Sequence, residues 1–157
     1  MLSADCVRDA VENHGDSVLR LCVVMLKNQH DAEDVVQDTF LKYIQNAPVF
    51  NDFEHERAWL ITVASNKCRD LLRFKSRHKA ESEDVLLNYS VDKESTGVLE
   101  ALMSISEKYR IILVLHYVEG YTINEISKIT GISVSAVKMR LSRGRKLLEE
   151  KYRKEYM

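Results

Sequence analysis

The stretch GYTINEISKITGISVSAVKMRLSRGRKLLEE, Gly120 to Glu150, decides the fold of the C-terminal part of the chain. Thr122 followed three residues later by Glu125 is a capping box, which predicts that a helix begins there. Gly131 stands where a left-handed residue closes a short helix, and Ser133 is suited to cap the next one. Two helices joined by a tight turn that contains glycine form a helix-turn-helix.

The second of these helices is predicted to have two different faces. One narrow stripe must pack inward, and it consists of Val137, Leu141, Gly144 and Leu148. The opposite face is short, polar and basic, as a helix that enters the major groove of DNA needs to be. The alternative is a solvated basic helix, but the capped partner helix and the turn glycine favour DNA binding. The predicted DNA contacts are Ser135, Lys138, Met139, Arg140, Ser142, Arg143, Arg145 and Lys146.

The composition predicts helices throughout. One proline and five glycines in 157 residues favour helix, and alternating runs of β-branched residues are missing. The fold class expected is all-α, with two small helical domains joined by a flexible acidic linker. We expect domains at 1–80 and 98–157, with the linker at 81–97. The helices expected in the first domain span about 16–27, 31–46 and 56–74, with a short loop at 49–54.

Charge is unevenly distributed although the formal net charge is only -1. Residues 1–50 carry 4 basic and 8 acidic residues, and residues 51–80 carry 7 basic and 4 acidic ones. Residues 81–97 carry 1 basic and 5 acidic residues, and residues 98–157 carry 11 basic and 7 acidic ones. Two basic blocks separated by acidic ones indicate two anion-facing surfaces rather than one uniformly basic coat.

The cysteines and the hydropathy pattern exclude other classes of protein. Cys6, Cys22 and Cys68 form no CxxC pair, and none has a histidine at zinc-ligand spacing, so we expect free thiols in a reducing cytosol and no metal site. No leader and no apolar stretch near 18 residues is present, because charges interrupt every candidate. We therefore expect a cytoplasmic protein without membrane insertion.

Two segments of the N-terminal part make a resemblance specific. AEDVVQDTFLKYI (Ala32 to Ile44) is followed by AWLITVASNKCRDLLR (Ala58 to Arg73), and the helix-turn-helix comes after an acidic segment. This order and spacing, which cover almost the whole chain, resemble the sigma-70 family and above all its small extracytoplasmic-function (ECF) group. The resemblance implies a non-catalytic subunit without cofactor, which directs RNA polymerase to promoters.

The resemblance also implies partners. Core RNA polymerase would be bound through its clamp helices and its flap, and promoter DNA through both domains. Many members of the group are held silent by an anti-sigma protein. The first predicted segment corresponds to the surface for the clamp helices, where an acidic, amide-bearing face suits a partner that presents arginines. Its candidate residues are Asp31, Glu33, Asp34, Gln37 and Asp38.

The loop and the helix after it correspond to the part of the family that opens the −10 promoter element. Phe50, Phe53 and Lys42 would frame a pocket for a flipped base, and Asn66 would bond to a base edge. Phe53 suits the core and DNA equally, whereas Trp59 is expected to pack in the core. The candidate backbone contacts are Arg57, Lys67, Arg69, Arg73 and Arg77. At the −35 element the family uses the recognition-helix positions that helical geometry predicts here.

Two rival functions make different predictions. A stand-alone helix-turn-helix regulator would bind a two-fold symmetric site without polymerase. An enzyme would use the carboxylates of Asp31, Glu33, Asp34 and Asp38 on a metal. Asp34 and Asp38 are spaced to share a helix face, but no suitably spaced histidine and no glycine-rich phosphate loop supports them.

Overall fold

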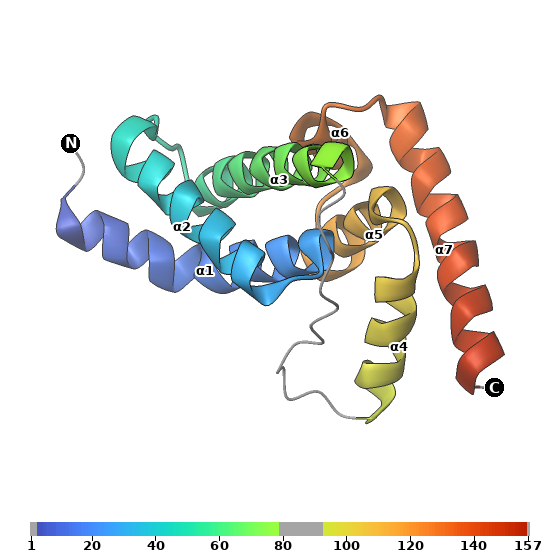
Figure 1. Cartoon of the computed structure of the whole chain (residues 1–157). Coiled ribbons are helices and arrows are strands. Elements are labelled where there is room, and N and C mark those ends of the chain that lie inside the picture. Colours follow the sequence, from blue (N-terminus) through green and yellow to red (C-terminus); the bar gives the residue numbers. More distant parts are fainter. Residues whose placement is uncertain (1–2, 79–92, 157) are drawn as a thin grey trace. The chain divides into compact units, whose positions relative to one another are not determined.

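The computed structural model describes residues 3–78 and 93–156 of the chain (Figure 1). Contacts divide the chain into two compact units, Met1–Val85 and Leu86–Met157. Every element that the structure assigns within the described ranges is helical. Each unit builds its own core from its own helices.

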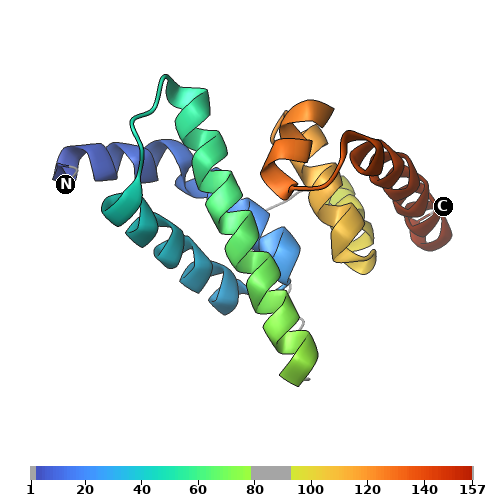
Figure 2. The same ribbon diagram turned by 90° about the horizontal axis from the view of Figure 1, so that it is seen from above.

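Unit 1 consists of three helices that pack pairwise against one another (Figures 1 and 2). They are α1 (Ala4–Leu26), α2 (Gln29–Asn46) and α3 (Phe53–His78). Side-chain caps fix where two of them begin: the Ser3 hydroxyl accepts from the amide of Cys6, and the Asn28 side chain accepts from the amide of Asp31. Lys27, in the left-handed conformation with φ 55°, ends α1 and turns the chain into α2.

Helix α1 begins at Ala4, twelve residues before the start at Asp16 that the sequence predicted. Gly15, which directly precedes the predicted start, lies inside the helix. The reason is tertiary, because Ala10, His14 and Val18 recur every four residues and are all buried. Their burial outweighs the roughly 1 kcal/mol by which an interior glycine disfavours a helix.

The core of unit 1 is drawn from all three helices. Leu21, Met25, Leu60 and Ile61 are among its largest fully buried side chains. Cys22 and Cys68 are buried free thiols, as expected, while Cys6 is exposed. A hydrogen bond with Cys22 together with burial raises the pKa of the Cys68 thiol, so this thiol is held in its neutral form.

Unit 2 is built around one long helix. Its elements are α4 (Lys93–Ser104), α5 (Glu107–Leu113), the π-helical segment η1 (Val114–Val118), α6 (Ile123–Thr130) and α7 (Val134–Tyr156). Helix α7 packs against α4, α5 and α6. The buried Arg110 side chain donates to the Ile105 carbonyl at 2.5 Å. This bond satisfies a backbone carbonyl just past the end of α4, where the helix itself supplies no donor.

The predicted helix-turn-helix is confirmed in each of its parts. The Thr122 amide donates to Glu125 Oε1 at 2.9 Å, and the Glu125 amide donates back to Thr122 Oγ1 at 3.2 Å, so both halves of the capping box form. Gly131 closes α6 with φ 79°. The Ala136 amide donates to Ser133 Oγ at 3.1 Å, which caps α7.

The inward stripe of α7 is also as predicted. Val137, Leu141 and Gly144 are buried, and Leu148 is half-buried. Gly144 lies where α5 approaches closely: a Cβ there would come within 3.3 Å of Leu113 Cγ and 3.4 Å of Tyr109 Cβ. The missing side chain therefore sets the distance between the two helices.

The linker expected at 81–97 falls mainly on residues 79–92, which lie outside the described residues. Its last five positions are helical, because α4 begins at Lys93 rather than at the predicted Val98. Gly97 is buried within this helix, so packing there outweighs its low helix propensity.

Candidate nucleic-acid interfaces

The outer face of α7 presents the polar and basic side chains that the sequence placed there. Seven of the eight DNA contacts predicted on α7 are exposed, and six of these seven lie on one face: Ser135, Lys138, Met139, Ser142, Arg143 and Lys146. We call these six residues the recognition face. Met139 stands at its centre with 58% of its surface accessible, which is unusual for a large apolar side chain and suits contact with a thymine methyl group.

Arg143 lies beside Tyr109 of the neighbouring helix α5. The interaction of the Arg143 side chain with the Tyr109 side chain lowers the pKa of that phenol. The ammonium group of Lys108 lies 5.0 Å from the centre of the same ring. Two cations are thus gathered beside the recognition face, and a phosphate or guanine edge would meet a preformed positive site.

Two of the eight predicted contacts on α7 depart from this face. Arg145 is exposed, but its guanidinium donates to the Tyr117 hydroxyl at 2.8 Å on the flank of the helix. Arg140 is half-buried on the other flank. The structure therefore brings together six of the eight residues and places Arg140 and Arg145 beside them.

The loop between α2 and α3 is organised around Phe50. This ring stacks on Tyr43 with centroids 6.0 Å apart, and it meets His55 at 5.3 Å and Trp59 at 5.9 Å edge to face. Trp59, predicted to lie in the core, is half-buried in this cluster. We call Tyr43, Phe50, His55 and Trp59 the aromatic cluster.

Asp52 and His55 fix the end of the loop. The Asp52 side chain accepts from the amide of His55 at 2.7 Å, and His55 Nδ1 accepts from the amide of Asn51 at 3.1 Å. Phe53, the first residue of α3, lies against the buried ring of His14 at 4.4 Å. With 51% of its surface accessible, Phe53 is available to a ligand while one side of its ring is supported.

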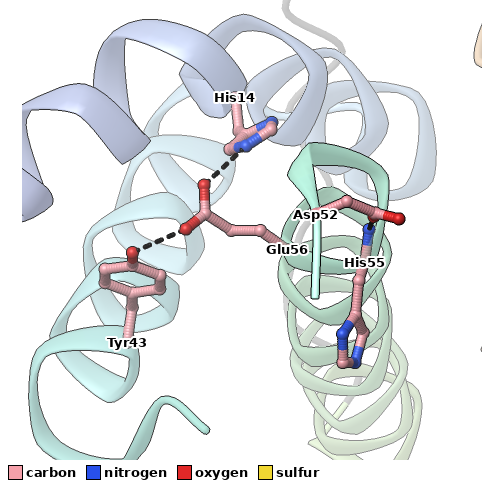
Figure 3. A network of polar contacts seen from close by, with 5 residues as sticks. All are labelled: His14, Tyr43, Asp52, His55 and Glu56. Atoms are coloured by element: carbon pink, nitrogen blue, oxygen red, sulfur yellow. Dashed lines mark hydrogen bonds and ion pairs between the residues drawn. The ribbon is translucent and has the colours of Figure 1, made fainter. Parts of the chain in front are cut away.

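A polar network not predicted from the sequence lies beneath this loop (Figure 3). Glu56 Oε1 lies 2.8 Å from His14 Nε2, and Tyr43 donates to Glu56 Oε2 at 2.8 Å. Burial and the hydrogen bond to Glu56 raise the pKa of the Tyr43 phenol. His14 and Glu56 are 42 residues apart in the chain, so no local pattern indicates their pairing.

The predicted basic contacts lie on α3 and are partly paired. Asn66 accepts a hydrogen bond from Arg69, and Arg73 forms an ion pair with Asp70 at 2.7 Å. Arg57 lies 3.6 Å from Glu54. The remaining candidates differ in exposure: Lys67 is half-buried, whereas Arg77 and, on α2, Lys42 are exposed.

The outward face of α2 carries the acidic candidates. Glu33, Asp34, Gln37 and Asp38 are exposed. Asp31 is only half-buried and forms an ion pair with Lys75 of α3, so it ties two helices together and presents less charge outward than predicted.

Sequence reasoning missed an apolar part of the same face. Leu41 is 51% exposed, and it comes four residues after Gln37 and three after Asp38, which puts all three side by side. Ile44, one further turn along, is also exposed. The sequence did contain a signal for this apolar surface, because Leu41 is a large apolar side chain within a stripe of acidic residues that was predicted to be exposed.

Unit 2 has an apolar groove that the sequence did not predict. It encloses about 420 Å³ between α4, the α5–η1 segment and α7. Tyr117 and Val118 of η1 line it and are more than half exposed. Arg145, which hydrogen-bonds to Tyr117, lies at its border together with Tyr152.

Within 3–78 and 93–156, no cluster of three or more histidine, cysteine or acidic side chains has the geometry to hold a metal ion. None of the helices assigned in these ranges is both long and apolar enough to cross a membrane.

Comparisons with known proteins identify the family. The family model described as Sigma-70 region 2 matches residues 10–78, and the one described as Sigma-70, region 4 matches residues 96–148. The RNA polymerase sigma factor CarQ of Myxococcus xanthus is 32% identical over 93% of this chain and 88% of its own length. The ECF RNA polymerase sigma factor SigW of Bacillus subtilis is 28% identical over 95% of this chain and 90% of its own.

A solved structure supports the fold. The sigma factor RpoE, determined in complex with the anti-sigma factor NepR from Bartonella quintana, matches with a TM-score of 0.79 over 98% of this chain and 99% of that chain, at 22% identity. The two family matches, each on its own unit, decide against a stand-alone regulator. The chain belongs to the sigma-70 family, as an ECF-type sigma factor that directs promoter recognition and transcription initiation.

Proposed function

We propose that the two units recognise different physical states of one promoter. Unit 2 would bind the −35 element as duplex through the recognition face, and unit 1 would hold the −10 element as a separated strand at the loop between α2 and α3. The observation that carries this proposal is the contrast between the two surfaces. One is a regular helix face of polar and basic side chains, and the other is a platform of aromatic rings.

The −35 assignment rests on the chemistry of the recognition face. Arg143 can bond to the O6 and N7 atoms of guanine, and Met139 offers the apolar contact that a thymine methyl accepts. Ser135 and Ser142 add short polar side chains that leave room for close approach to the bases. Lys138 and Lys146 would position the helix by contacting phosphates.

The −10 assignment rests on Phe50 and Phe53. Extruding a base costs a few kcal/mol of stacking and pairing. Stacking on an aromatic side chain returns about 1–3 kcal/mol per base. Phe53 is the more accessible of the two rings. Lys42 on α2 and Arg77 on α3 are exposed cations that suit the phosphates of the strand.

Core polymerase would be bound at two surfaces. The exposed face of α2, with Asp34, Gln37, Asp38 and the apolar Leu41 at its centre, suits the clamp helices. The apolar groove of unit 2 suits an apolar segment of the flap. The groove borders the flank of α7 marked by Arg145 and not the recognition face, so both could be occupied together.

Two further expectations arise from family membership. The chain would act in the cytoplasm as a DNA-binding subunit and would catalyse no reaction itself. An anti-sigma protein is expected to inhibit it, as NepR was found in complex with RpoE. It would compete with polymerase for one or both of the surfaces proposed for polymerase.

Run-off transcription with purified bacterial core RNA polymerase tests the proposal. We expect initiation at defined promoters only when the chain is added. Substituting Phe53 should impair promoter opening, while substituting Met139 should impair binding to duplex. Tight binding to a symmetric site in the absence of polymerase would instead support a stand-alone regulator.

A further inference from the structure

The network of His14, Tyr43 and Glu56 joins all three helices of unit 1 at one carboxylate (Figure 3). His14 comes from α1, Tyr43 from α2 and Glu56 from the first turn of α3. His14 has no accessible surface, and only 22% of the Glu56 side chain is accessible. A carboxylate so placed is costly unless each oxygen is hydrogen-bonded, and here each oxygen has one partner.

Burial limits the hydrogen bonds that His14 can make in this network. Among the described residues, none bonds to His14 Nδ1, which is buried. The hydrogen bond to Glu56 is therefore made through Nε2, which donates when it carries the ring proton. His14 Nε2 then donates to one carboxyl oxygen of Glu56, and Tyr43 Oη donates to the other.

Each of these two donors also supports one phenylalanine of the loop. The ring of His14 lies against Phe53 at 4.4 Å, and the ring of Tyr43 stacks with Phe50 at 6.0 Å. Phe50 and Phe53 are the two rings assigned to the unpaired strand. One carboxylate therefore orients the two side chains on which both rings rest.

We propose that Glu56 is a positioning residue for −10 recognition: it fixes the His14 and Tyr43 rings, and through them the spacing and tilt of Phe53 and Phe50. This inference rests on the proposed function of the loop. Glu56 itself need not touch DNA. Its effect is to hold two stacking surfaces in place before the strand arrives, so that little ordering is needed when a base is captured.

The test uses holoenzyme assembled from bacterial core polymerase and the full chain. The probe is a forked duplex whose single-stranded −10 overhang has been selected by wild-type holoenzyme from a randomised pool. We expect Glu56→Gln to weaken binding of this probe about tenfold, the equivalent of losing one stacked base. Binding of a fully duplex −35 probe and of core polymerase should not change.

A spectroscopic measurement on the free chain separates positioning from a general loss of fold. Trp59 is the only tryptophan, and it lies 6.1 Å from Tyr43 and 5.9 Å from Phe50. Glu56→Gln should increase quenching of its fluorescence by acrylamide while the helical circular dichroism stays at the wild-type value. Glu12→Gln, an equal change of charge at an exposed site on α1, is the matched control and should alter neither signal.

If Glu56→Gln does not fold, Tyr43→Phe tests the inference in its place. It keeps the ring against Phe50 and removes one of the two donors. We expect it to fold and to weaken forked-probe binding severalfold. Wild-type binding by a folded Glu56→Gln, or by Tyr43→Phe where the first variant is unfolded, would overturn the inference.

Phe53→Ala distinguishes this inference from the proposed function. If Phe53→Ala loses forked-probe binding and the folded Glu56→Gln does not, the loop binds the strand and only the positioning role of Glu56 fails. If Phe53→Ala binds the forked probe like wild type, the assignment of the loop to the −10 strand fails with it.

Discussion

The recognition face in unit 2 and the aromatic loop in unit 1 are built in different ways. The recognition face lies along one helix, whose buried and exposed stripes are set by helical periodicity alone. The loop takes its shape from His14, Tyr43 and Glu56, which come from three helices. Duplex DNA presents a regular groove that a regular helix can enter, whereas a single base needs a site shaped on several sides.

This difference has a mechanical consequence. On α7, each exposed side chain depends mainly on its own contacts, so substitutions should act separately. In the loop, each ring depends on a neighbour that depends on Glu56, so substitutions should be coupled. Single substitutions in the two regions can therefore test the contrast.

The largest effect is expected at Arg143. Arg143→Glu should weaken holoenzyme binding to a duplex −35 probe about a hundredfold, because it removes a base contact and adds repulsion from phosphates. Binding of core polymerase, measured by gel filtration, should remain. Lys151→Glu, the same change farther along α7, is the control. Loss of core binding by Arg143→Glu would mean that this face is wrongly assigned.

The next effect is pH-dependent and concerns Tyr43. Because its pKa is raised in the folded chain, the folded state holds the phenolic proton more tightly than the unfolded state does. This contribution is complete below the unfolded pKa near 10 and is lost as the pH rises above it. Tyr43→Phe should therefore cost about 2 kcal/mol at pH 7, and this cost should shrink above about pH 10.

Urea unfolding followed by Trp59 fluorescence measures this cost in unit 1, which contains the only tryptophan. Val63→Ala, which shortens a buried side chain without a titrating group, is the control, and its cost should stay constant with pH. A constant cost for Tyr43→Phe between pH 7 and 11 would contradict the raised pKa of Tyr43.

The two loop phenylalanines should differ from each other. Phe50→Ala and Phe53→Ala should each weaken forked-probe binding about tenfold. Only Phe50→Ala should also change the fluorescence of Trp59 and lower stability, because Phe50 belongs to the aromatic cluster and Phe53 is half exposed. Equal stability losses in the two variants would contradict this division.

The smallest effect is expected at the capping box of unit 2. Thr122→Ala should cost about 1 kcal/mol, seen as about fivefold faster amide exchange in α6. The Trp59 unfolding transition should not move, because Trp59 lies in unit 1. Glu125→Gln, which keeps the capping-box chemistry, should change the exchange rate little. A shift of the Trp59 transition in Thr122→Ala would show that the two units unfold together.

The sequence predicted unit 2 better than unit 1 for a physical reason. The capping box, Gly131 and Ser133 are local signals, and each determines the structure within four residues of itself. The buried stripe of α7 is determined by its period. The true start of α1 was missed because Gly15 is a local signal for a boundary, whereas the burial of His14 and Val18 depends on α2 and α3.

The candidate sites show the same pattern. Exposure of Met139 and Arg143 could be predicted from helical geometry, and so could that of Asp34 and Asp38. The pairing of Glu56 with His14 and Tyr43 could not be predicted, because a glutamate in the first turn of a helix already has a sufficient explanation in the helix dipole. Nor could the partner of Arg145, since Tyr117 lies 28 residues away in the chain.

The π-helical turn of η1 shifts the register in which side chains follow one another around the helix in unit 2. The Glu119 amide donates to the Val114 carbonyl at 2.9 Å, five residues back instead of four, so the turn accommodates one extra residue. The side chains are buried without interruption from Tyr109 to Leu115, and Tyr117 and Val118 in the second half of the turn emerge at the surface. Deleting one residue here would restore an ordinary helix and rotate the residues after it by about a quarter turn. The exposure of Tyr117 and Val118 at the groove thus depends on the one extra residue that this turn accommodates.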